Sequence, residues 1–126
     1  MKEIRRVFHI KAKPDEIYNA LTNPLSIELW TGYSAVMETK AGTEFSIWEG
    51  DIHGKNVEFI VNKKIIQEWY FGNQKNPSIV TIELFGMKGG TKIELIHINV
   101  PDEAFNNIDY GWKEYYFGAL KRYLEK

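Results

Sequence analysis

Apolar and polar residues recur at different periods along the chain, and the changes of period predict the order of its elements. Residues 2–10 mix β-branched and aromatic residues with charges, which is typical of a strand. Residues 14–22 begin at a proline, carry acidic residues in the first turn and place their apolar residues on one helical face. Residues 24–30 follow the Asn23-Pro24 break and predict a second short helix.

From about Ser34 the pattern changes to short strands that are separated by turn residues. We expect six of them, at residues 34–39, 44–50, 55–61, 64–71, 78–85 and 91–100. Their connections have the length of hairpin loops, so the segment predicts an antiparallel meander.

The chain ends in a segment that begins near Pro101 and predicts an amphipathic helix of roughly six turns. Its apolar residues recur at intervals of three and four: Phe105, Ile108, Trp112, Tyr115, Tyr116, Ala119, Leu120 and Tyr123. Neither an apolar helix stripe nor an apolar sheet face is stable alone in water, so the helix should cover one face of a curved sheet. We expect Gly118 and Ala119 to let the helix approach the sheet closely. The prediction is one α+β domain over residues 1–126.

Composition narrows the classes of partner. The 126 residues include 16 basic and 17 acidic residues, which gives a net charge of -1 and no basic excess for nucleic acid. Cysteine is absent, which excludes disulfides and thiol catalysis and fits a reducing compartment. The N-terminus has no apolar core of a signal peptide, and no apolar run is long enough to cross a bilayer. We expect a cytoplasmic protein with no membrane insertion.

Several local motifs resemble one family. They are PDEIYNALTNP followed by Trp30, then GTEF, IHGKNVEFIVNKKIIQEWYF, GGTKIELIHINVP and GWKEYYFGALK. Together with the order of elements, they resemble the helix-grip fold of the START-like (SRPBCC) superfamily. Within it, they are similar to the C-terminal domain of activators of the heat-shock protein ninety ATPase.

The resemblance implies a sheet that grips a long C-terminal helix, with space for a small hydrophobic or amphipathic ligand between them. It also implies a possible interaction with a homologue of heat-shock protein ninety. Eukaryotic activators carry a separate N-terminal domain that makes major contacts to the chaperone, and we expect this chain to lack it. A third class, the enzymes of the superfamily, implies a titratable group inside the chamber.

The polar residues form no readable catalytic or metal-binding constellation. His9, His53 and His97 fall on different predicted elements, whereas a zinc site needs three or four convergent ligands. Glu49, Asp51 and His53 share one turn and are interpreted as a solvated hairpin tip. We expect no metal, no cofactor and no catalytic residue.

The aromatic residues leave two alternatives open, a packed core or a ligand cavity. The cavity candidates are Trp30, Phe45, Ile47, Phe59, Trp69, Phe71, Ile82, Leu95, His97, Trp112 and Tyr116. By strand alternation Val57 shares the inner face with Phe59. His97 should point toward the helix, either as a hydrogen-bonded histidine at the core edge or as an anchor for a ligand headgroup. Trp48 and Tyr70 are expected on the opposite, solvent-side face.

Overall fold

The computed structural model describes residues 2–72 and 74–125. Its elements are β1 (Lys2–Ile10), α1 (Pro14–Thr22), α2 (Pro24–Thr31), β2 (Glu44–Ile47), β3 (Ile52–Ile60), β4 (Lys64–Trp69), β5 (Ser78–Met87), β6 (Gly90–Val100), the 3₁₀ turn η1 (Asp102–Ala104), α3 (Phe105–Gly111), the π-helical turn η2 (Trp112–Tyr116) and α4 (Phe117–Leu124). No helix in this described part is long and apolar enough to cross a membrane.

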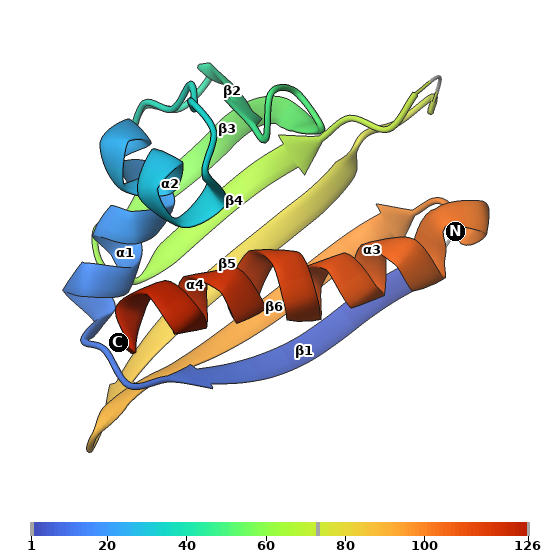
Figure 1. The fold of residues 1–126 in the computed structure, drawn as a ribbon. Coiled ribbons are helices and arrows are strands. Elements are labelled where there is room, and N and C mark those ends of the chain that lie inside the picture. The colour runs from blue at the N-terminus through green and yellow to red at the C-terminus, as the bar shows by residue number, and fades with distance from the viewer. Residues whose placement is uncertain (1, 73, 126) are drawn as a thin grey trace.

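The strands form one antiparallel sheet in the order β1-β6-β5-β4-β3-β2. The first strand, β1, is therefore an edge strand and pairs with the last strand, β6. The helical run from η1 to α4 lies across one face of this curved sheet (Figure 1). The helices α1 and α2 lie beside α4, at the C-terminal end of that helical run. The predicted α+β helix-grip arrangement is confirmed. Apolar residues of both layers, among them Ile93, Leu95, Phe117 and Leu120, are 0–1% exposed and form the core between sheet and helix.

The expected strand at residues 34–39 does not form, so the described residues contain five strands rather than six after the two short helices. Only Val36 bridges the sheet edge, through backbone hydrogen bonds of 2.9 and 3.0 Å with Ser46. The buried Asn56 side chain donates to the carbonyl oxygen of Glu38 over 3.1 Å. In a strand, this carbonyl would instead accept a hydrogen bond from the backbone of a neighbouring strand. The segment is therefore fixed as a loop over the edge of the sheet.

A register shift between Asn56 and Glu58 corrects the predicted face of Val57. Such a bulge adds a residue to one strand and reverses the alternation beyond it. Asn56 is fully buried, whereas Val57 is 40% exposed. Asn56 is therefore buried where Val57 was expected to be, and Phe59 remains partly buried against the core.

The π-helical turn η2 changes which side of the C-terminal helix faces the sheet. A π turn holds one extra residue, so the apolar stripe moves by one position across it. Phe117 is consequently buried at 1% exposure, while Tyr115 is 62% exposed. The small residue Gly118 serves the helix itself, because an added Cβ there would lie 2.3 Å from the Lys113 carbonyl oxygen. The expectation that Gly118 brings the helix close to the sheet is wrong.

Candidate functional site

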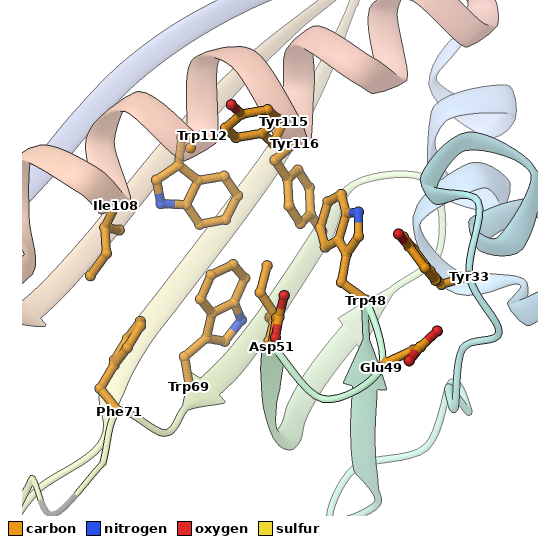
Figure 2. Close-up of a pocket in the computed structure, with 12 residues that line it drawn as sticks. Tyr33, Trp48, Glu49, Asp51, Trp69, Phe71, Ile108, Trp112, Tyr115 and Tyr116 are labelled. Atoms are coloured by element: carbon orange, nitrogen blue, oxygen red, sulfur yellow. The ribbon is translucent and has the colours of Figure 1, made fainter.

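A pocket of about 700 Å³ opens at one end of the helix-covered face. It lies between the β2–β3 turn, the end of β4 and the helical residues of α3 and η2 (Figure 2). Its lining consists of Tyr33, Trp48, Glu49, Asp51, Ile52, Trp69, Phe71, Ile108, Gly111, Trp112, Tyr115 and Tyr116. Seven of these twelve side chains are aromatic, which gives the pocket walls of flat, rigid apolar surface.

Trp69 and Trp112 form the inner wall. Their rings stack with centroids 4.7 Å apart and an interplanar angle of 22°, and the Tyr116 ring lies 4.6 Å from that of Trp112. Trp69 is held in place by a buried chain in which its Nε1–H donates to Gln67 over 3.0 Å and Gln67 donates to Asn56 over 2.9 Å. Because these polar groups are satisfied within the protein, the Trp69 ring is fixed before any ligand arrives.

Trp48 forms the wall opposite the helix, which corrects the prediction that it lies on the solvent-side face. Its ring lies 5.5 Å from that of Trp30 and 6.0 Å from that of Tyr116. Trp48 and Glu49 both adopt left-handed backbone angles, with φ of 53° and 55°. This conformation is uncommon for residues other than glycine and turns Trp48 out of strand alternation. Tyr70, by contrast, is 38% exposed.

Two carboxylates and, besides Tyr116, two further tyrosines border the pocket. Glu49 and Asp51 lie on the same turn as Trp48, and Tyr33 follows α2 (Figure 2). Tyr115 comes from the π-helical turn. Glu49 and Asp51 are exposed, as expected of a hairpin tip, but they also contribute to the pocket.

His97 lies in the core behind the aromatic wall and points toward the helix, as strand alternation predicts. The Trp112 Nε1–H donates to its Nδ1 over 3.0 Å, and its ring stacks on Phe71 at 5.9 Å. Burial lowers the pKa of His97 from 6.5 to about 4, so the imidazole is neutral at neutral pH. Accepting at Nδ1 places its proton on Nε2, a buried atom with no hydrogen-bond partner among the described residues.

The structure separates the eleven sequence-predicted cavity residues into two groups. Trp69, Phe71, Trp112 and Tyr116 line the pocket. The others lie in or against the core behind it: Trp30, Phe45, Ile47, Phe59, Ile82, Leu95 and His97. Within the described ranges, no group of three or more His, Asp or Glu side chains is placed to hold a metal ion.

Sequence reasoning missed the remaining lining residues, which are Tyr33, Trp48, Glu49, Asp51, Ile52, Ile108, Gly111 and Tyr115. Ile108 and Tyr115 were assigned to the apolar stripe of the helix, but not to a pocket. The turn residues had one available signal, the Trp-Glu-Gly-Asp sequence of residues 48–51, in which Gly50 indicates a tight reversal. Strand alternation does not apply through such a reversal, so it gave Trp48 the wrong face.

Comparison with known proteins places this geometry in a family. The model of the "Activator of Hsp90 ATPase homolog 1-like protein" family matches residues 11–125. The mouse activator of 90 kDa heat shock protein ATPase homolog 2 is 28% identical over 113 residues, which cover 88% of this chain and 34% of the mouse protein. The human homolog 1 is 24% identical over 111 residues, covering 86% of this chain and 33% of its own length. The chain thus spans about a third of these curated relatives.

Solved structures share the fold over nearly the whole chain. An HSP90 activator from Plasmodium falciparum superposes with a TM-score of 0.82 at 25% identity and covers 94% of this chain and 97% of its own. The solution structure of the Aha1 dimer from Colwellia psychrerythraea gives a TM-score of 0.86 at 21% identity, covering 99% and 97%. With a family model matched over residues 11–125 and this shared fold, the chain belongs to the family of Activator of Hsp90 ATPase homolog 1-like proteins.

Proposed function

We propose that this protein is a non-catalytic START-like domain that holds a small hydrophobic or amphipathic molecule in the aromatic pocket. The observation that carries the proposal is the pocket of about 700 Å³ with seven aromatic side chains in its lining. Sites for small molecules typically have volumes of roughly 300–1,000 Å³ and mostly apolar walls. We also propose that it acts in the cytoplasm, since a sequence without cysteine suits a reducing compartment.

The rigidity of the walls supports binding. Trp112 is 2% exposed and Tyr116 is 4% exposed, and both rings pack against Phe117, which does not line the pocket. Burial also raises the pKa of the Tyr116 hydroxyl, which keeps this wall uncharged. A ligand that enters a preformed site loses less free energy to ordering of side chains than one that must assemble its site.

An NMR titration of the indole N–H signals tests this proposal. Small apolar aromatic compounds added to labelled protein should move the signals of Trp48, Trp69 and Trp112, whose rings line the pocket. The signal of Trp30 serves as an internal comparison, because its Nε1–H donates to the Ala20 carbonyl over 2.8 Å outside the pocket. Signals that stay unchanged for every compound up to its solubility limit contradict the proposal.

A second candidate function is interaction with a homologue of heat-shock protein ninety. It is favoured by the names of the relatives, which are activators of that chaperone's ATPase. The contact that we propose for it is the exposed ring pair of Tyr110 and Tyr115, which are 56% and 62% exposed with centroids 5.9 Å apart. Exposed tyrosines are enriched at protein interfaces.

The ATPase rate of the chaperone homologue from the same host, measured with and without this protein, tests the second candidate. A stimulated rate that falls on changing Tyr110→Ser supports it, because Tyr110 lies outside the pocket lining. An unchanged rate together with no detectable complex removes it.

A further inference from the structure

The two carboxylates at the pocket have no hydrogen-bond or ion-pair partner among the described residues. Glu49 and Asp51 both line the pocket and both are exposed. Within residues 2–72 and 74–125, neither side chain takes part in a hydrogen bond, an ion pair or another interaction. Their negative charges are therefore available to whatever occupies the pocket.

The rest of the lining supplies no compensating positive charge. Among the described residues that border the pocket, none is Lys, Arg or His. The pocket therefore combines two carboxylates with an otherwise uncharged wall. Low-dielectric walls beside a site of one charge sign focus its field and attract ligands of the opposite sign.

The aromatic walls favour the same sign of charge. The faces of Trp and Tyr rings carry negative potential and attract cations, with Trp giving the strongest interaction. Three of the four Trp residues in the chain line the pocket, with Tyr33, Tyr115 and Tyr116 beside them. The rings come from several elements, among them the turn that carries Glu49 and Asp51, and both the rings and the carboxylates favour a positively charged group.

Resting on the proposed function of this pocket, we propose that its ligand is an amphipathic cation. It consists of an aromatic or short-chain apolar group that carries a protonated amine or a quaternary ammonium. The apolar group packs between Trp48 and the stacked rings of Trp69 and Trp112, and the cationic group lies beside Glu49 and Asp51. A carboxylate ligand such as a fatty acid is disfavoured, because it would enter beside two like charges without a cation to pair with it.

A matched series of three naphthalene compounds separates the charge preference from binding itself. They are 1-naphthylmethylamine, which is cationic at pH 7, neutral 1-naphthalenemethanol and anionic 1-naphthoate. Isothermal titration calorimetry at low salt should give the amine a Kd about tenfold lower than that of the alcohol, and the naphthoate the weakest binding. The difference between amine and alcohol should shrink at high salt, because salt screens the exposed carboxylates.

Variants identify the carboxylates as the source of the preference. The double variant Glu49→Gln with Asp51→Asn should bring the Kd of the amine to within about twofold of the Kd of the alcohol, both measured on that variant. The matched control is Glu28→Gln with Glu44→Gln, which removes two exposed carboxylates that do not line the pocket. This control should keep the full preference, because the net charge of the protein changes equally in both.

The outcomes distinguish the two proposals. Binding of the alcohol with no gain for the amine overturns the cation preference and leaves the ligand-binding function in place. Tighter binding of the naphthoate than of the amine also overturns the preference. If none of the three compounds binds, the proposed function fails and the cation preference fails with it.

Discussion

Trp112 donates its indole N–H to Nδ1 of His97 over 3.0 Å, which joins the C-terminal helix to β6, the strand beside the edge strand β1. Both side chains are buried, with exposures of 2% and 0%. The same Trp112 ring stacks on Trp69, so this hydrogen bond helps to fix the inner wall of the pocket. The His97 imidazole must stay neutral to accept this hydrogen bond at Nδ1, so the hydrogen bond that fixes the pocket wall depends on pH.

The first prediction concerns the pH dependence of stability that His97 causes. Burial lowers the pKa of His97 from 6.5 to about 4. Between pH 6.5 and pH 4, the unfolded chain therefore has His97 protonated while the folded protein keeps it neutral, so stability falls as the pH falls. His97 should thus cost the folded state roughly 3 kcal/mol by pH 4 relative to pH 7. His97→Gln keeps an acceptor for Trp112 but cannot titrate.

Urea unfolding of both proteins at several pH values between 7 and 4 measures this effect. The stability of wild type relative to His97→Gln should decline across the range, since His9 and His53 are common to both and cancel. A stability difference that stays constant from pH 7 to pH 4 contradicts the assignment of a neutral, buried imidazole.

The sequence was sufficient for the fold because its signals were periodic. Strand alternation placed Ile93, Leu95 and His97 on the inner face, and helical spacing placed Trp112, Tyr116 and Leu120 toward the sheet, where all six are buried. The three strand residues lie in β6, a long regular strand in which one period holds over many positions, and the three helix residues are spaced four apart. The order of elements followed from the same patterns.

The pocket was only partly predictable because irregular backbone forms much of it. Trp48 reaches the pocket through a left-handed turn, and Tyr115 reaches it through a π-helical turn that shifts the helical stripe. Neither conformation has a periodic signature in the sequence. Val57 was misplaced for a similar reason, since the adjacent bulge interrupts alternation.

The second prediction concerns the two glycines that flank the π-helical turn. Gly118→Ala should destabilise the protein by about 1–3 kcal/mol, because the new Cβ would lie 2.3 Å from the backbone oxygen of Lys113. Gly111→Ala is the matched control. It has a helical φ of -60° and no atom within 4 Å of an added Cβ, so it should be neutral or stabilise by up to about 1 kcal/mol. Thermal unfolding compares them, and equal destabilisation by both contradicts this account of the π-helical turn.

The third prediction concerns the ion pair that ties the first strand to the C-terminal helix. Arg6 donates two hydrogen bonds to Asp109, of 2.9 and 2.6 Å, and they hold the pKa of that carboxyl below its ordinary value. Asp109→Asn should cost about 1 kcal/mol at pH 7, and the cost should fade as pH drops through the aspartate range.

Glu3→Gln is the control for this pair, because Glu3 contacts Arg5 where both side chains are well exposed. Exposed pairs typically contribute well under about 1 kcal/mol, so this variant should change stability little. Chemical denaturation at pH 7 and pH 3 measures the free energy of unfolding of wild type and of both variants. A cost for Asp109→Asn that is no larger than that for Glu3→Gln shows that the Arg6 pair contributes no more than a surface contact.

The most direct test of the central claim is to fill the pocket and measure binding of neutral 1-naphthalenemethanol. Gly111 lines the pocket and has open space where its Cβ would be, so Gly111→Leu extends into the pocket without displacing the core. Asn107→Leu adds the same side chain at an exposed site on α3 that does not line the pocket. By calorimetry, Gly111→Leu should raise the Kd at least about tenfold while Asn107→Leu leaves it at the wild-type value. If both variants bind the compound as tightly as wild type does, the aromatic pocket is not the ligand site.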